Sequence, residues 1–406
     1  MYAKRAIIAG LLCLDVIPDL SAVSEGQFQH RFQPGHLMRT GGVRSIPGGA
    51  VANTGLALHR LGIPVRLVGK IGDDLFGQVL QDALGEVSPH LAADLVIDPG
   101  QSTGVTIVID PPGVDRSFLQ HPGVNDTFYA SDLPREILES VDLFHFGYPP
   151  LMRSIYRGEG AELASILGRA RRAGLTTALD FSLPDLSSGP AARLDWLAIL
   201  DNTLPLVDLF VPSLEELIFL LDRKLFDQHC AKPDLSLIEA IEPSRLEGLA
   251  DRILRYGVKA LLVKLGPRGI YLRTAPSNRW KKCGRGLEHL GEDWHDRQIW
   301  APAFAVTEKS RTGAGDAAIA GFLAGILRGA SPEQALRMAV ATGAHCVETP
   351  GGMAELAGWD QIGSRIERGW ETVPLDLAPY GWSEGRAQGV WIKPPSHTTN
   401  SSSITR

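Results

Sequence analysis

Short apolar segments that resemble buried strands alternate along the chain with longer segments that have helical spacing. The strand-like segments are residues 6–12, 65–70, 143–147, 176–180, 206–211 and 260–264. The helix-like segments are residues 51–61, 75–84, 161–173, 214–221, 245–256, 316–327 and 332–347. This alternation predicts an α/β fold of the doubly wound type, in which a mostly parallel sheet has helices on both faces.

Two regions interrupt the alternation. Residues 27–46 are polar and rich in turn-forming residues, and residues 104–120 (GVTIVIDPPGVDRSFLQ) have the pattern of a hairpin with a Pro-Pro-Gly turn. Strands that do not belong to the central sheet can cover its edge. We therefore expect a small β-sheet lid with strands from about residues 13–46 and 104–121.

Composition and charge narrow the class of protein. A chain of 406 residues with 44% hydrophobic and 21% charged residues can bury a large core. Its net charge of −6 argues against a nucleic-acid partner. The four cysteines are far apart and lack metal-ligand spacing. The apolar run near the N-terminus is too short to span a membrane and lacks a signal-peptide cleavage site, so we expect a cytoplasmic protein without a membrane partner.

A glycine-rich stretch precedes an apolar helical run at residues 310–327 (SRTGAGDAAIAGFLAGIL). Gly313 and Gly315 let another group approach the backbone closely, and the free amides of a helix N-terminus attract phosphate. Asp316 would repel a resting phosphate there. It fits better as a base that takes a proton from a nucleophile attacking the phosphate. The alternative is that Asp316 only caps the helix.

A second informative stretch is residues 47–78. Gly48 and Gly49 precede a helix, and Asn53 lies on its first turn with both a donor and an acceptor to offer. We expect Asp15 at the carboxyl end of the first strand, where open α/β sheets bind their ligands. A carboxylate, an amide and glycine amides together suit a polyhydroxyl ligand such as a sugar. The alternative is an ordinary strand–turn–helix corner with a capping asparagine.

In combination, the two stretches resemble the ribokinase-like, PfkB-type family of carbohydrate kinases. The similar segments are GGAVANTGLALHRLG with GKIGDDLFG near the N-terminus and TGAGDAAIAGFLAG near the C-terminus. VPSLEEL resembles the family's Asn-x-x-Glu element, and LLVKLGPRGIYL resembles its strand–Gly-x-x-Gly–strand segment. The resemblance covers about residues 6–352. It implies a ribokinase-like α/β domain with a β-sheet lid, and transfer of the γ-phosphoryl group of ATP to a hydroxyl with Mg²⁺ as cofactor.

The resemblance also implies roles for individual residues. Asp316 corresponds to the catalytic base, and Gly313, Ala314 and Gly315 correspond to the anion hole. The residues that correspond to the sugar site, including the lid, are Asp15, Gly48, Gly49, Asn53 and Arg116. Those that correspond to the ATP side are Ser213, Lys264, Gly266, Gly269 and Thr312. Glu216 corresponds to the residue that organises the Mg²⁺ shell.

Domain organisation and partners follow from the same comparison. We expect a kinase domain over residues 1–370 and a C-terminal extension over residues 371–406, with a mobile Ser/Thr-rich end. The expected partner is a small sugar or nucleoside, and a homodimer through the lid is a further expectation. Residues 277–298 are expected to form a surface excursion at the nucleotide edge or at a subunit contact, without a zinc site.

Some residues depart from the family pattern. Ser310 replaces the usual Asp, which puts a family-typical potassium site in doubt, and Arg311 replaces a small residue. Ser213 replaces the usual Asn. A sugar-binding pseudokinase therefore remains an alternative, as does a nucleoside kinase, since Phe144, Phe146 and Tyr148 could line a base pocket, although core packing is the commoner role of such residues.

Overall fold

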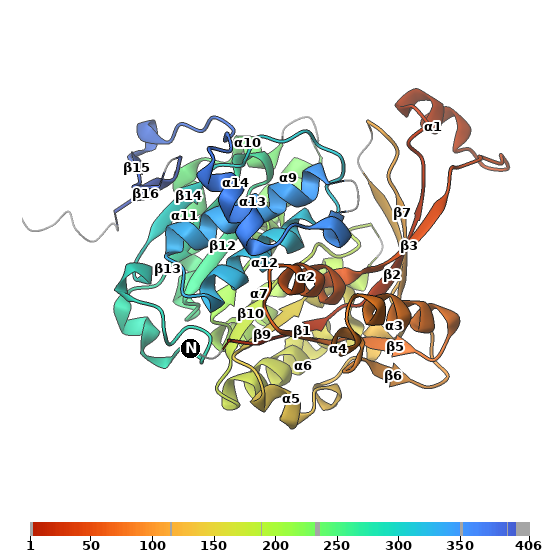
Figure 1. Cartoon of the computed structure of the whole chain (residues 1–406), viewed down its shortest axis with the longest axis horizontal. Coiled ribbons are helices and arrows are strands. Elements are labelled where there is room, and N and C mark those ends of the chain that lie inside the picture. The colour runs from red at the N-terminus through yellow and green to blue at the C-terminus, as the bar shows by residue number, and fades with distance from the viewer. Residues whose placement is uncertain are drawn as a thin grey trace, which may run out of the picture.

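A ten-stranded sheet runs through the computed structural model, which describes residues 3–113, 116–187, 189–231, 236–349, 352–387 and 389–394 (Figure 1). From one edge to the other, its strands are β15 (Ser383–Glu384), β16 (Trp391–Lys393), β14 (Gln298–Ala301), β13 (Ile270–Thr274), β12 (Ala260–Lys264), β11 (Leu209–Phe210), β10 (Thr176–Leu179), β9 (Leu143–Gly147), β1 (Ala6–Gly10) and β4 (Val65–Val68). Neighbours from β4 to β12 are parallel, and the remaining strands are antiparallel. The predicted fold class is confirmed.

Helices cover both faces of this sheet. The helices that pack into the core on one face are α2 (Gly49–Arg60), α3 (Leu75–Val87), α4 (Pro89–Ala92), α12 (Ala314–Leu327), α13 (Pro332–Glu348) and α14 (Trp359–Glu367). Those on the other face are α5 (Arg135–Glu139), α6 (Arg153–Arg172), α7 (Trp196–Thr203), α8 (Leu214–Leu221), α9 (Arg223–Cys230), α10 (Leu237–Ala240) and α11 (Pro243–Arg255). Successive residues of β1 alternate between the two cores, as expected for a strand buried on both faces.

The helix α12 lies deep in the molecule because most of its side chains are small. Its residues from Asp316 to Leu327 are all buried. A Cβ atom at Gly321 would lie 2.6 Å from Thr342 Oγ1 and 2.7 Å from the carbonyl oxygen of Met338, so the glycine lets α13 pack closely. This packing fixes the N-terminus of α12, which carries the glycine-rich stretch.

The predicted lid is a separate four-stranded sheet. Its order is β3 (Val43–Gly48), β2 (Cys13–Pro18), β7 (Val105–Ile109) and β8 (Ser117–His121). β7 and β8 form the antiparallel hairpin expected from the sequence. The lid strands project from the body, with α1 (Glu25–Arg31) at their far end (Figure 1). The strands β5 (Lys70–Gly72) and β6 (Val96–Asp98) form a separate two-stranded sheet near the base of the lid.

One expected strand is shorter than predicted. The segment 6–12 forms β1 as far as Gly10, and the chain then leaves the main sheet and continues into the lid as β2. Asp15 therefore lies on a lid strand, and the expectation that it stands at the carboxyl end of the first central strand is wrong. The bend lies where Gly10, at φ 122°, contacts Gly147; a Cβ atom on Gly10 would lie 2.3 Å from the Gly147 carbonyl oxygen.

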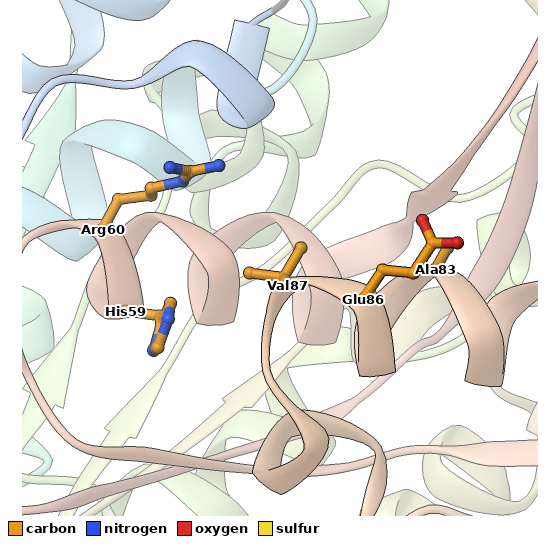
Figure 2. A pocket seen from close by; sticks show the side chains of 5 residues that line it. All are labelled: His59, Arg60, Ala83, Glu86 and Val87. Carbon is orange, nitrogen blue, oxygen red and sulfur yellow. The ribbon is translucent and has the colours of Figure 1, made fainter.

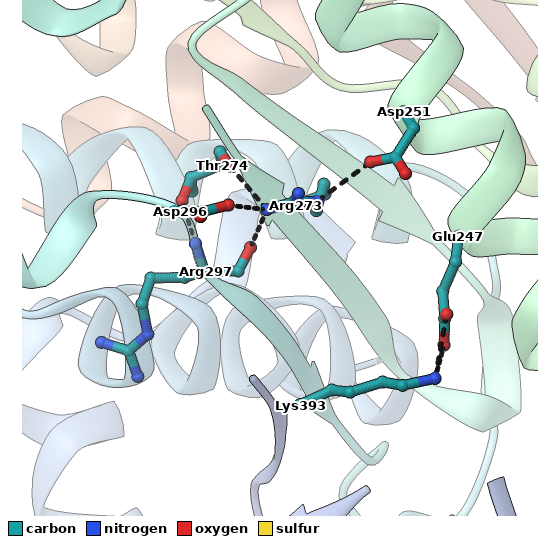
Figure 3. Close-up of polar contacts among 7 residues, drawn as sticks. All are labelled: Glu247, Asp251, Arg273, Thr274, Asp296, Arg297 and Lys393. Carbon is teal, nitrogen blue, oxygen red and sulfur yellow. Dashed lines mark hydrogen bonds and ion pairs between the residues drawn. The ribbon is translucent and has the colours of Figure 1, made fainter. Parts of the chain in front are cut away.

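The segment after residue 370 extends the main sheet. β16 pairs with β14, with Trp391 opposite Trp300. Lys393 Nζ contacts both carboxylate oxygens of Glu247 on α11 at 2.9 and 3.0 Å (Figure 3). In the same view, Arg273 on β13 pairs with acidic side chains on either side of the strand. The expected mobile end, residues 395–406, lies outside the described residues.

Residues 277–298 pack against the body at the amino ends of the parallel strands. Arg285 donates hydrogen bonds to the carbonyl oxygens of Val141 and Ala173. These two residues lie just before the first residues of β9 and β10. Trp280 and Trp294 are buried, and Trp294 Nε1 donates to the carbonyl oxygen of Ala330. This end of the strands is opposite the candidate site residues, which gather at the carboxyl ends, so a position at the nucleotide edge is not supported; the alternative, a subunit contact, stays a prediction.

Clusters of metal-ligating side chains and membrane-spanning helices are both missing from the described residues. Among the described residues, no group of three or more His, Cys, Asp or Glu side chains has the geometry to hold a metal ion. Within the same described residues, no helix combines the length and the apolar character needed to cross a bilayer.

Candidate active site

The carboxyl ends of neighbouring parallel strands bring polar side chains together beside the N-terminus of α12. Tyr148 follows β9, Asp180 follows β10, Ser213 follows β11, and Lys264 is the last residue of β12. This edge of an open α/β sheet is where ligands bind, because the loops that follow each strand converge there. The structure thus places residues from both halves of the sequence in one site.

Asp316 is the centre of this site. Its side chain is only 4% exposed and accepts hydrogen bonds from three residues. Tyr148 OH contacts Oδ1 and Oδ2 at 2.9 and 2.8 Å, Asn53 Nδ2 contacts Oδ2 at 3.1 Å, and Thr54 Oγ1 contacts Oδ1 at 3.3 Å. The carboxylate accepts these contacts from α2 and from the turn after β9, and none of these hydrogen bonds comes from an amide of its own helix, so the alternative of a simple helix cap is not supported.

Burial raises the pKa of Asp316 to about 7, and the negative charge of Asp180 acts in the same direction. The hydrogen bond from Tyr148 and the positive charge of Lys264 lower this pKa, but they do not cancel the effect of burial. A carboxyl group with a pKa near neutrality can accept and release a proton under physiological conditions. This is the proton affinity expected of a general base.

The loop before α12 has the backbone geometry expected of the glycine-rich stretch. Gly313 adopts a left-handed conformation, with φ 76°, and no side chain caps the helix. The Ala314 amide donates to the carbonyl oxygen of Arg311 at 3.3 Å, whereas the first turn of the helix begins with the bond from Ala317 to Gly313. A Cβ atom on Gly315 would lie 3.6 Å from Lys264 Cδ, so the lysine stem lies beside the helix N-terminus.

Lys264 forms a buried ion pair with Asp180, with 2.8 Å between Nζ and Oδ1. Burial alone would lower the pKa of Lys264, but the negative charges of Asp180 and Glu216 outweigh it and hold the pKa above its ordinary value. Lys264 therefore stays positively charged. Its charge lies close to the N-terminus of α12, where it adds to the positive end of the helix dipole.

Glu216 lies on the first turn of α8 and forms a capping box with Ser213. Ser213 N donates to Glu216 Oε2 at 2.6 Å, and Glu216 N donates to Ser213 Oγ at 3.2 Å. Burial raises the pKa of Glu216 to about 8, while the positive charge of Lys264 opposes this shift. The serine that replaces the family's asparagine thus has a local structural partner, and it holds Glu216 at the sheet edge.

The predicted sugar-side residues lie where the lid joins the body. Asp15 is buried, and burial raises its pKa to about 6. A Cβ atom on Gly48 would lie 2.2 Å from Asp15 Cγ, and one on Gly49 would lie 2.5 Å from the Leu11 carbonyl oxygen. Both positions therefore require glycine. Asn53 lies on the following helix, and its amide group contacts Asp316.

Arg116 links the lid to the glycine-rich loop. Its Nη1 atom donates to Thr312 Oγ1 at 2.8 Å, across 196 residues of sequence. A cavity of about 280 Å³ opens beside this contact, and the residues that line it are Asp110, Gly113, Arg116, Glu308, Lys309, Ser310 and Arg311. A larger cavity of about 550 Å³ lies between α2 and α3 (Figure 2), but none of the predicted site residues lines it.

The loop between β12 and β13 borders the same edge. Gly266 and Gly269 both have positive φ, at 50° and 85°, so the chain turns sharply there. A Cβ atom on Gly269 would lie 2.0 Å from the carbonyl oxygen of Ala301. The glycines predicted to border a nucleotide therefore follow Lys264 directly and shape the turn beside it.

Sequence reasoning missed two contributors to the site. Thr54 was assigned no contact, and Tyr148 was considered only as part of a base pocket, whereas Asp180 was expected near this sheet edge, where it could touch substrate. Phe144 and Phe146 are fully buried in the core, so they cannot stack on a nucleoside base, and that interpretation is wrong for them. A polar residue directly after the predicted strand 143–147 was the signal that could have identified Tyr148.

Known proteins resemble this chain in sequence. The family model for pfkB family carbohydrate kinases matches residues 11–357, so the chain belongs to this family and is a carbohydrate kinase. Fructokinase-1 of Zea mays is 26% identical over 340 residues, which cover 82% of this chain and 87% of the maize protein. Fructokinase-2 of Oryza sativa subsp. japonica is 26% identical over 358 residues, covering 86% and 89%.

Solved structures show the same fold. The apo form of a putative ribokinase II from E. coli has a TM-score of 0.66 at 20% identity and covers 90% of this chain and 99% of its own. The ribokinase of Arabidopsis thaliana, solved with ribose and ATP, has a TM-score of 0.65 at 18% identity with the same two coverages. The predicted ribokinase-like fold is confirmed.

Proposed function

We propose that the protein transfers the γ-phosphoryl group of ATP to a hydroxyl group of a sugar or sugar-like small molecule, with Asp316 as the base. The observation that carries this proposal is the position of Asp316. Its buried carboxylate, with a pKa of about 7, lies at the N-terminus of α12 within hydrogen-bond distance of three donors. A carboxylate so placed can take a proton from a hydroxyl that attacks a phosphate bound at the helix N-terminus.

The loop before α12 would stabilise the phosphoryl group during its transfer. Amides of Gly313, Ala314 and Gly315 would donate to the oxygens of the phosphoryl group as charge shifts during transfer. Ala314 N must exchange its 3.3 Å contact with Arg311 for such a donation. Lys264, which stays charged beside Gly315, would add a positive charge at the same place.

The ATP side of the site is assigned to residues at the ends of β11 and β12. Ser213, Lys264, Gly266, Gly269 and Thr312 would border the nucleotide. ATP-bound structures of the same fold support the use of ATP, among them the Arabidopsis ribokinase and a putative ribokinase II from E. coli in complex with ATP and Mg²⁺. The glycine turn after Lys264 would let the nucleotide approach the backbone.

Magnesium is the metal we assign to this reaction. Mg²⁺ binds hard oxygen ligands and keeps several of its waters. Glu216 offers a half-buried carboxylate, and Asp180 Oδ2 has no hydrogen-bond partner among the described residues, so it can accept from a water of the shell. These groups fit the ion. When bound, Mg²⁺ would neutralise part of the charge on the ATP phosphates.

The sugar is assigned to the space between the lid and the body. Asp15, Asn53 and the amides at Gly48 and Gly49 would contact its hydroxyls, and Arg116 would close over it. The fructokinase relatives make fructose the first substrate to test, followed by ribose. Measurement of ATP consumption with a panel of sugars tests the proposal, and consumption that no sugar stimulates would contradict it.

The lid is also assigned a contact with a second copy of the chain. Val43, Ile107 and Leu119 lie on one face of its strands and are 63%, 38% and 56% exposed, and burial of these side chains between two lids would remove apolar area from water. Sedimentation of the wild type and of Leu119→Ser tests this. We expect a dimer that weakens in the variant, and a wild type that is monomeric at all concentrations would contradict the assignment.

A sugar-binding pseudokinase is the second candidate, and one observation favours it. Ser310 stands where the family has a carboxylate, and its Oγ accepts a hydrogen bond from the Thr312 amide at 3.2 Å. The loop is thus held without that carboxylate. Binding of a sugar without ATP turnover would support this candidate, whereas formation of a sugar phosphate would exclude it.

A further inference from the structure

Tyr148 has a backbone conformation that its local sequence does not favour. Its φ and ψ are 63° and 47°, in the left-handed region that bulky side chains rarely adopt. Residues before a proline prefer an extended backbone, and Pro149 follows directly. Neighbours hold the turn in place: Leu11 N donates to the Gly147 carbonyl oxygen at 3.3 Å, and Leu151 N donates to the Tyr148 carbonyl oxygen at 3.1 Å.

This conformation carries the Tyr148 hydroxyl to Asp316, 168 residues further along the chain. The hydroxyl oxygen lies 2.9 Å from Oδ1 and 2.8 Å from Oδ2, nearly equidistant from the two carboxylate oxygens. Asn53 and Thr54 each contact one oxygen at longer distances. One donor that bridges both oxygens fixes the rotation of the carboxylate, because any turn about its bond lengthens one of the two contacts.

We propose that Tyr148 is a positioning residue for phosphoryl transfer, whose hydroxyl holds the Asp316 carboxylate in one orientation and favours its ionised form. This inference rests on the proposed role of Asp316 as the base. Tyr148 itself would not exchange a proton with the substrate. It would act through Asp316, in the way that a hydrogen-bonded partner orients a catalytic group.

Several other charged or titratable groups near Asp316 and Tyr148 interact electrostatically with these two residues. They come from different elements: Asp180 after β10, Lys264 on β12, Cys346 on α13 and, on the side of Tyr148, Glu216 on α8. Burial raises the pKa of Tyr148 well above its ordinary value, so its hydroxyl keeps its proton and stays a donor. A hydrogen bond to a carboxylate favours the charged form.

Replacement of the hydroxyl tests the inference. In Tyr148→Phe we expect kcat at pH 7 to fall by about tenfold or more, with KM for the sugar and for ATP within about twofold of the wild type. The acidic limb of the pH profile of kcat should move up by about one pH unit, because the lost hydrogen bond no longer favours the ionised Asp316. Part of the lost activity should therefore return at alkaline pH.

A matched control separates this effect from the loss of any buried hydroxyl. Tyr271 is fully buried, and its hydroxyl has no hydrogen-bond partner among the described residues. Tyr271→Phe should leave kcat, both KM values and the pH profile unchanged. A Tyr148→Phe variant that behaves like this control would overturn the inference.

A second substitution keeps the inference testable if Tyr148→Phe does not fold. Site-specific 3-fluorotyrosine at residue 148 preserves the shape of the ring and makes the hydroxyl a stronger donor, so the acidic limb should move to lower pH. An unchanged limb would contradict the inference. The Asp316→Asn variant separates a failure of the proposed function from a failure of this inference. Full turnover in Asp316→Asn would refute the assignment of Asp316 as the base. An inactive Asp316→Asn variant together with an unaltered Tyr148→Phe variant would refute only the role of Tyr148.

Discussion

The edge of the main sheet and the lid differ in how their side chains are held. At the sheet edge, Asp316, Lys264 and Glu216 are each held by a partner in the body: Asp316 and Glu216 accept hydrogen bonds from Tyr148 and Ser213, and Lys264 forms an ion pair with Asp180. On the lid, large apolar side chains such as Phe118 and Leu119 are exposed. The groups that we propose to react thus belong to the packed body, and recognition and closure are the roles that we propose for the lid.

This difference has an energetic cause. A buried charge is costly unless it is paired and hydrogen-bonded, and its pKa shifts as a result. The raised pKa values of Asp316 and Glu216 show this cost at the sheet edge, and that of Asp15 shows it where the lid joins the body, whereas the outer part of the lid carries exposed apolar side chains. Strongly shifted groups that share a site are typical of catalytic machinery. Substitutions at the sheet edge should therefore change turnover, and substitutions in the lid should change binding or association.

The largest effect is expected from the loss of the base. Asp316→Asn should lower kcat by about 10²–10⁴-fold and leave ATP binding intact, because the amide cannot accept the substrate proton. Steady-state kinetics and nucleotide titration check this. Asp360→Asn, an exposed position on α14, is the matched control. Near-normal turnover in a folded Asp316→Asn variant would remove this residue from the mechanism.

The pH dependence of the wild type gives the next largest effect. Asp316 must be ionised to accept a proton, and its pKa is about 7. Below that value, kcat should therefore fall by about tenfold for each pH unit, and it should level off above pH 8. Initial rates from pH 5 to 9 at saturating substrates check this. A rate that stays constant down to pH 5 would show that another group accepts the proton.

A smaller effect is expected from the sugar side. Asp15→Ala should raise KM for the sugar by about 10–100-fold, equivalent to about 1–3 kcal/mol for a lost buried hydrogen bond, with little change in KM for ATP. Asp19→Ala, at an exposed position on the same segment, should have no effect. If KM for ATP rose and KM for the sugar did not change, Asp15 would lie on the ATP side of the site, and our assignment of the two substrates would be wrong.

The smallest effect is expected in the lid, and a paired leucine substitution makes the contrast measurable. Leu119→Ala on β8 should change the free energy of unfolding by no more than about 0.5 kcal/mol, because the side chain is exposed. Leu323→Ala on α12 should lower it by about 2–5 kcal/mol, because it leaves a cavity in the core. Urea denaturation gives both values, and equal losses would contradict the division into a packed body and a loosely held lid.

Much of the fold followed from local patterns in the sequence. The segments 143–147, 214–221 and 260–264 were predicted with the bounds that the structure has, because apolar runs bounded by turn residues or a capping serine define their own ends. The glycine-rich stretch before Asp316 likewise identified the N-terminus of α12.

Other features depend on contacts between distant segments. Tyr148 reaches Asp316 only through a left-handed turn that its neighbours Gly147 and Pro149 do not predict. Asp15 was misplaced because the bend after Gly10 arises from a close approach to the strand β9. The strands β15 and β16 form by pairing with β14, so their short sequences carry little signal of their own.

Detection of the product is the most direct test of the central claim, that a sugar hydroxyl receives the γ-phosphoryl group with Asp316 as the base. The enzyme, ATP and Mg²⁺ would be incubated with fructose, ribose and a wider sugar panel, and the products followed by ³¹P NMR. The account predicts a phosphomonoester signal with at least one sugar, formed together with ADP by the wild type and not measurably by Asp316→Asn. Sugar binding with no phosphomonoester from any member of the panel, or equal product formation by Asp316→Asn, would contradict it.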